Sequence, residues 1–233
     1  MRLSGTTLRT VRAMQDPAAS AAILALMVRT GDRVHALKTL LRQLGHREAV
    51  KKPPSPRLTS LPPSTASQVM DLYLALGGIH ARPRLAPGSW DIAYETGLLL
   101  ELDEDLHFNR YRAVTLDAPW AAELPWTSPY RGYMATGERR AGTGGKRWTT
   151  PSSEMLFGRA DPDGVLGEHG APRWKQRALY DAMKDAAAAT GQSKLARVSI
   201  YDGVEGHLLN DVLYGRVTVD PHSVAELIER RTV

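Results

Sequence analysis

The sequence predicts an α/β protein with a helical appendage at its N-terminus. Apolar residues recur at helical spacing in several segments, and two short apolar runs around a glycine turn are typical of a β-hairpin. The 233 residues, 42% hydrophobic and 24% charged, suffice for one large domain with a small addition. The chain has no cysteine, which excludes disulfide scaffolds, thiolate nucleophiles and cysteine-ligated metal centres.

The first part of the chain is predicted to form two helices. Asp16 and Pro17 are typical of a helix start, and this helix is expected to reach Val28. A second helix carries apolar residues at helical spacing over residues 34–44, and Gly45 can end it. The two helices can bind DNA, pair with a second copy in a homodimer or cover the body, and the sequence leaves these arrangements open.

A proline-rich segment follows, with five prolines in residues 51–64. Prolines at this density favour a linker or an extended strap. After it, Ser64 or Thr65 can cap a helix that runs to Leu76, and residues 79–85 have the composition of a strand.

The next two predicted strands are Trp90–Tyr94 and Leu98–Asp103, joined by a turn that contains glycine. If this turn holds three residues, Asp91 lies opposite Glu101 on one face, with Cβ atoms about 5 Å apart. Two carboxylates at that spacing repel, and a bound divalent cation is the simplest remedy. With a two-residue turn Asp91 would face Leu102, and no such site would form.

The second half of the chain gives a less regular pattern. Residues 108–172 are predicted to form an irregular insertion. Trp120, Trp126, Trp148 and Trp174 could stack on bases, but packing in the core is expected of them. A helix over 175–190, a strand over 195–201 and a short helix over 223–230 are predicted from their apolar periodicity and bounding turn residues.

The stretch WDIAYETGLLLELDEDLH, residues 90–107, resembles the PD-(D/E)xK nuclease superfamily, most closely its very-short-patch repair and small restriction-type endonuclease branch. Asp91 follows a turn with proline and glycine, and an apolar strand then leads to Glu101, Asp103 and His107. Later elements are also similar, and the resemblance covers residues 64–107 and 172–201. These later elements are Lys175-Gln-Arg177-Ala-Leu179, Gly191 and Leu195-Ala-Arg197.

This resemblance implies a restriction-endonuclease-like fold, in which helices flank a mixed central sheet. It implies that Asp91 and Glu101 bind Mg²⁺ or Mn²⁺, and that His107, with Asp103, positions or activates water. The superfamily usually has a lysine two residues after the glutamate, where this chain has Asp103. The lysine's role therefore falls to His107, to Lys175 or to a second metal ion.

The implied function is Mg²⁺-dependent endonucleolytic hydrolysis of DNA phosphodiester bonds, in repair, restriction or defence. The alternative is a catalytically inactive nuclease-like protein that binds nucleic acid or another partner. The two readings diverge at Asp103, because that residue replaces the lysine.

The charge distribution is typical of a nucleic-acid-binding protein, and a solvated basic helix pair in an arginine-rich protein is the alternative. Residues 1–60 carry a net charge of +8 and the remainder carries −3. Most of the cations are arginines, whose guanidinium groups make two-pronged contacts with phosphate. The residues expected to contact nucleic acid are Arg33, Lys38, Arg42, Arg110, Arg139, Arg140, Lys146 and Arg147.

The predicted organisation has three parts. A basic helical appendage spans residues 1–50, a proline-rich linker spans 51–63, and a nuclease-like domain spans 64–233 with the insertion at 108–172. No apolar run approaches the roughly 18–20 residues that a membrane span needs, so a cytoplasmic protein without membrane contact is expected.

Overall fold

A small mixed sheet organises a mostly helical chain in the computed structural model, which describes residues 31–233. Strand β2 (Leu99–Asp103) is the middle strand; β1 (Ile92–Ala93) pairs with it antiparallel and β3 (Leu195–Ser199) pairs with it parallel. A separate two-stranded hairpin joins β4 (Gly203–Val204) to β5 (His207–Leu208). The helix predicted up to Val28 lies outside the described residues.

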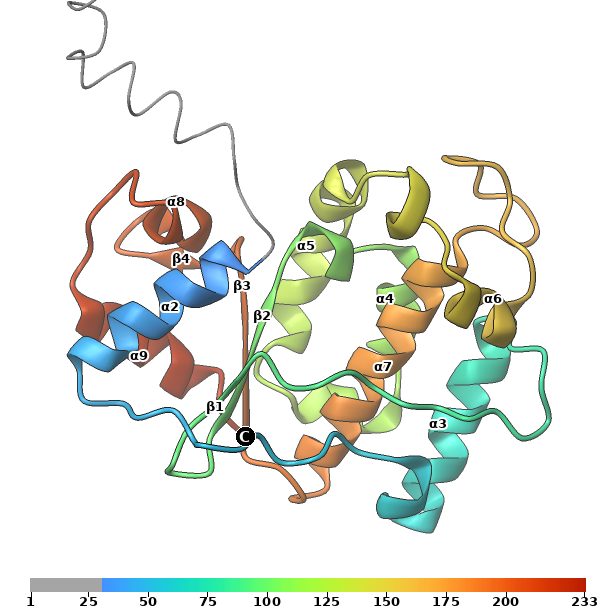
Figure 1. Ribbon diagram of the computed structural model, residues 1–233, viewed down its shortest axis with the longest axis horizontal. Helices are drawn as coiled ribbons and strands as arrows, with labels where there is room; N and C mark the ends of the chain where they lie inside the picture. Colours follow the sequence, from blue (N-terminus) through green and yellow to red (C-terminus); the bar gives the residue numbers. More distant parts are fainter. Residues whose placement is uncertain (1–30) are drawn as a thin grey trace, which may run out of the picture.

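The three-stranded sheet stands between two groups of helices (Figure 1). One group consists of α2 (Asp32–Gln43), α8 (Leu209–Leu213) and α9 (Pro221–Arg230). The other consists of α3 (Pro63–Ala75), α4 (Arg110–Thr115), α5 (Thr127–Arg140), α6 (Pro151–Phe157) and α7 (Pro172–Ala189). In the described part of the chain, no helix combines the length and the apolar character that a membrane crossing requires.

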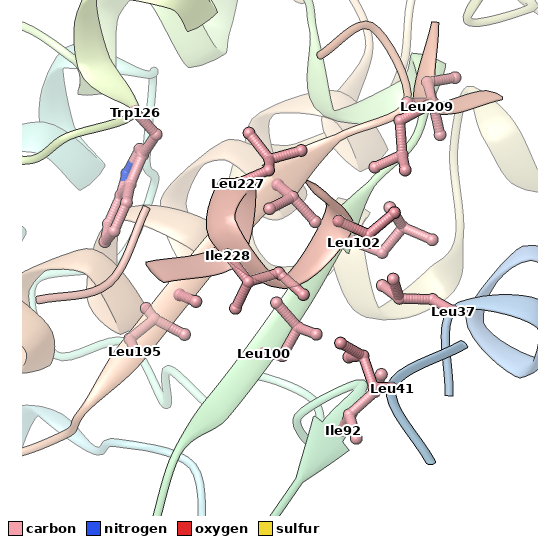
Figure 2. Packing of buried hydrophobic residues seen from close by; sticks show 14 of the residues in the cluster. Leu37, Leu41, Ile92, Leu100, Leu102, Trp126, Leu195, Leu209, Leu227 and Ile228 are labelled. Atoms are coloured by element: carbon pink, nitrogen blue, oxygen red, sulfur yellow. The ribbon is translucent and has the colours of Figure 1, made fainter. Parts of the chain in front are cut away.

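Helix α2 is part of the main hydrophobic core. Its residues Leu37 and Leu41 are fully buried and belong to the cluster that includes Leu100 and Leu102 of β2 (Figure 2). The leucine face that the sequence predicts therefore covers the body. The described part of the expected appendage does not stand apart from the domain, because burying that face on the sheet removes its apolar surface from water.

The proline-rich segment follows the surface of the same body. The ammonium of Lys52 donates to the carbonyl oxygens of Trp90 at 2.6 Å and Asp91 at 2.7 Å. A short 3₁₀ helix covers Leu58–Ser60, and Leu61 is buried in a second core cluster with residues of α3 and α7. The segment is an extended strap that is fixed at several points.

The predicted β-hairpin is confirmed in its register. Ile92 pairs with Leu100, and the backbone N–H of Tyr94 donates to the carbonyl of Leu98 at 2.9 Å, which leaves three residues in the turn. Gly97 ends this turn with φ of 83°, a conformation that favours glycine. Asp91 therefore lies opposite Glu101, as the three-residue turn requires.

The strand predicted over residues 79–85 is wrong, because this segment is irregular. Pro83 has no N–H to donate to a sheet, and Arg84 is exposed. The segment instead forms one wall of a cavity.

The prediction of irregular structure over residues 108–172 is also wrong, because this segment contains α4, α5 and α6. Asn109 caps α4 through its side-chain oxygen, and Thr150 caps α6 with Pro151 in the first turn. The expected core packing is confirmed for Trp126, Trp148 and Trp174, which are buried, while Trp120 is partly buried against the main core. The predicted C-terminal elements are confirmed as α7, β3 and α9.

Candidate functional site

A cavity of about 850 Å³ opens between α7, α6 and the irregular segment that precedes β1. Asp91 and Glu101 both line it, and so does His107. Helix α7 contributes one polar face, at a spacing of three or four residues. The lining residues on that face are Arg173, Gln176, Arg177, Tyr180, Asp181 and Lys184.

The Asp91 and Glu101 carboxylates are held by the hairpin backbone. The N–H of Asp91 donates to Oε1 of Glu101 at 3.1 Å, and the N–H of Leu102 donates to Oδ2 of Asp91 at 3.0 Å. Glu101 is almost fully buried, whereas Asp91 is half-buried. Burial and the negative charge of Asp91 raise the pKa of Glu101 to about 7. The charge of Asp91 thus disfavours the charged form of Glu101.

Lys184 on α7 supplies a positive charge to this pair. Its Nζ lies 2.8 Å from Oε1 of Glu101 and donates to the carbonyl of Ser89 at 3.2 Å. The ammonium also lies 4.9 Å from the ring centroid of Trp90. Sequence reasoning missed Lys184, and the signal that could have found it is a buried-face lysine within the alanine-rich stretch of α7.

Asp103 is part of a buried ion-pair network. Nη1 of Arg197 lies 2.8 and 2.7 Å from the two carboxylate oxygens of Asp103, and both side chains are completely buried. Arg197 also lies 3.4 Å from Asp181 and 3.1 Å from Asp185. Asp185 in turn pairs with Arg112 at 2.6 Å. Asp103 therefore compensates a buried arginine.

His107 connects this network to the cavity. Its Nδ1 lies 2.8 Å from Asp181 and 3.0 Å from Asp103, and its Nε2 lies 2.5 Å from Nη1 of Arg177. Burial and the charge of Arg177 lower the pKa of His107, whereas the carboxylates of Asp181 and Asp103 raise it. A guanidinium can only donate, so Nε2 must accept from Arg177. This contact requires a neutral imidazole with its proton on Nδ1, which faces the two carboxylates.

Asp103, His107 and Asp181 offer ligand atoms that lie within 4.8 Å of one another, so this buried group could hold a metal ion. In the structure the same carboxylate oxygens contact Arg197 and the Nδ1 proton of His107. A metal ion there would have to displace these partners. The pair formed by Asp91 and Glu101 lines the same cavity, and the cation that contacts this pair is Lys184.

The other predicted site residues lie elsewhere. Lys175 does not line the cavity. Its Nζ instead lies near two aromatic rings, 5.4 Å from the ring centroid of Tyr111 and 6.0 Å from that of Phe157. None of the eight predicted nucleic-acid contacts lines the cavity either. Four of them are paired with acids: Arg33 with Glu104 (2.9 Å), Lys38 and Arg42 with Glu48 (2.7 and 3.1 Å), and Arg110 with Glu138 (2.7 Å). The remaining four are Arg139 and Arg140 at the end of α5, and Lys146 and Arg147 in the 3₁₀ turn Gly145–Arg147.

Comparison with known proteins places the chain in a family without naming its chemistry. The model of a family of unknown function (DUF7255) matches residues 71–215. This match spans more than half of the chain, and the chain belongs to that family. No curated protein and no solved structure matches it. The matched residues include the hairpin, the cavity face of α7 and β3.

Proposed function

We propose that this protein is a metal-dependent hydrolase of DNA phosphodiester bonds that works in the cavity beside α7. The observation that carries the proposal is the opposed pair of Asp91 and Glu101, with the ammonium of Lys184 at 2.8 Å from Glu101. Two carboxylates and a lysine at one cavity wall provide ligands for a divalent cation and a compensating charge. The guanidinium groups in the same cavity suit a polyanionic substrate.

The donor set fits a hard divalent cation. Carboxylate oxygens are the ligands that Mg²⁺ and Mn²⁺ prefer. The hydrogen bonds found among the described residues engage Oδ2 of Asp91 and Oε1 of Glu101, which leaves Oδ1 and Oε2 as donors. When bound, such an ion would polarise a phosphate and lower the pKa of its water ligand.

Lys184 takes the role that the resemblance assigns to a lysine after the glutamate. Asp103 cannot take it, because its carboxylate is completely buried against Arg197. Lys184 instead reaches the glutamate from α7 and offsets the repulsion between the two acids. The resemblance also implies a restriction-endonuclease-like fold. The strand order β1-β2-β3 and the position of α7 beside β2 support that fold for the domain.

The contact between Lys184 and Glu101 also favours a second candidate function. An ammonium that already neutralises Glu101 can take the place of a metal ion permanently. The protein would then bind nucleic acid in the cavity without hydrolysing it.

The test is incubation of the full chain with plasmid, linear and mismatched DNA, with Mg²⁺, with Mn²⁺ and with EDTA. We expect cleavage that needs the divalent ion and that falls by about 10²-fold or more in Asp91→Asn, Glu101→Gln and Lys184→Met. Glu95→Gln is the matched control, because Glu95 is an exposed acid in the turn of the same hairpin. Cleavage by Asp91→Asn at the parent's rate would overturn the proposal, and binding without cleavage by the parent would favour the second candidate.

A further inference from the structure

Two arginines lie at the end of the cavity that is remote from Lys184. Arg173 and Arg177 are one helical turn apart on the cavity face of α7. Lys184 lies two turns beyond Arg177, about 10 Å along the helix axis. A group held by the arginines is therefore distinct from one held by Asp91 and Glu101.

Neither guanidinium has an acidic partner among the described residues, since no carboxylate oxygen lies within 4.0 Å of either one. Arg173 donates from Nη1 to the side-chain oxygen of Gln176 at 2.5 Å, and Arg177 donates to Nε2 of His107. The Nε of Arg177 is buried and has no hydrogen-bond partner. Both side chains are half-buried. Two like charges at this spacing on a helix destabilise it, and burial adds a desolvation cost.

The neutral partners fix the direction of the two guanidinium groups. Gln176 holds Arg173, while His107 holds Arg177 and is itself held by Asp181 at 2.8 Å. Neutral partners orient a guanidinium without cancelling its charge. Arg84 lines the same cavity from the irregular segment before β1. Asp181 lines the same cavity, but its carboxylate contacts His107 and Arg197 rather than either of these arginines. The arrangement is an oriented pair of positive charges with no carboxylate in contact among the described residues.

We propose that Arg173 and Arg177 form a phosphate-binding subsite, separate from the Asp91 and Glu101 carboxylates. Paired guanidinium groups match the tetrahedral oxygens of phosphate through two-pronged hydrogen bonds. The ligand is a phosphate group, either free or carried by a nucleic-acid strand. The link to a nucleic-acid phosphate rests on the proposed function, whereas affinity for phosphate itself does not.

The experiment measures binding to the full chain in EDTA, so that no hydrolysis contributes. Inorganic phosphate is titrated by calorimetry, and fluorescent oligonucleotides with and without a 5′-phosphate are titrated by anisotropy. The test variant is the double substitution Arg173→Gln and Arg177→Gln. The control is Arg216→Gln with Arg230→Gln, which removes the same charge from the α8 and α9 side of the sheet.

We expect the test variant to lose phosphate affinity by a factor on the order of ten to a hundred, because charge-assisted hydrogen bonds are lost. The control variant should bind like the parent. A loss confined to the 5′-phosphorylated oligonucleotide would identify a terminal phosphate, and an equal loss with both would identify an internal one. A loss with inorganic phosphate alone would identify a free phosphate ligand.

Equal affinity of the parent and the test variant for every probe would overturn the subsite, and so would an equal loss in the control variant. If the test variant fails to fold, as judged by circular dichroism, the arginine-to-lysine pair replaces it, with an intermediate loss expected. Glu101→Gln should keep phosphate affinity. A protein that binds phosphate in this way but cleaves no DNA would keep the subsite while losing the proposed function.

Discussion

The two faces of strand β2 are buried by different interactions. Leu100 and Leu102 pack with the leucines of α2 on one side of the sheet (Figure 2), where burial removes apolar surface from water. Glu101 and Asp103 are buried just as deeply on the α7 side, where each carboxylate contacts a cation. The apolar face tolerates many partners of suitable volume, whereas the charged face requires particular residues at particular atoms.

The largest expected effect comes from removing Arg197. Arg197→Met leaves the buried Asp103 without its cation and removes one partner each from Asp181 and Asp185, which should cost about 3–5 kcal/mol in free energy of unfolding at pH 7. Burial raises the pKa of Asp103, but the charge of Arg197 and the hydrogen bond from His107 outweigh burial and lower this pKa overall. The stabilisation by this carboxylate is therefore present above its ordinary pKa of 3.8 and is lost as pH falls below it.

Urea unfolding at several pH values measures this cost. The deficit of Arg197→Met should shrink in acid, whereas Leu100→Ala on the other face should lose a similar amount at every pH. A deficit below about 1 kcal/mol at pH 7 would show that the charged face is dispensable.

The apolar face can be tested at α2. Leu41→Ala should cost about 2–5 kcal/mol, because Leu41 is 1% exposed within the main core. Val50→Ala is the control, since Val50 is fully exposed just beyond the helix. Thermal or urea unfolding of the two variants measures the difference. If Leu41→Ala unfolded like the parent, α2 would be an appendage after all.

Glu101→Gln should stabilise the metal-free protein at alkaline pH. The pKa of Glu101 is raised to about 7 in the folded state from 4.5, so the folded state binds the proton more tightly and stability falls as pH rises between these values. The variant should exceed the parent by up to about 3 kcal/mol at pH 8 and match it near pH 5. Unfolding in EDTA at both values measures this, and a gain that is equal at both would contradict the shift.

The smallest effect is expected at an exposed ion pair. Arg110→Gln removes the contact with Glu138, in which the arginine side chain is 52% exposed. The loss should be at most about 1 kcal/mol and should decrease with salt. Unfolding at low and high salt tests this, and a loss comparable to that of Arg197→Met would erase the distinction between surface and buried charges.

The sequence predicts those parts of the site that are local in the chain. The opposition of Asp91 and Glu101 follows from a three-residue turn, because only ten positions separate the two residues. Lys184 is 83 positions from Glu101, and Arg197 is 94 positions from Asp103. No local pattern links such partners, since their contact depends on the parallel pairing of β2 with β3 and on the docking of α7.

The same limit applies to the fold, because only elements with a local pattern in the sequence could be predicted. The long helix α7 and the strand β3 have enough residues for their periodicity to be read. Helices α4 and α6 have six and seven residues, too few for a helical repeat to stand out, and their ends are marked only by caps. The strap at residues 51–63 has a linker's composition, yet Lys52 and Leu61 fix it through contacts that composition does not encode.

The parallel pairing of β2 with β3 also sets an order of events during synthesis. The hairpin of β1 and β2 can form early, but β3 emerges almost a hundred residues later, as the pairing of Leu99 with Leu195 requires. Until then β2 has an open edge. Glu101 and Asp103 keep charges on that strand, and charges on an open edge discourage pairing with other chains. The acids that end as buried counter-charges thus also protect the incomplete chain from aggregation.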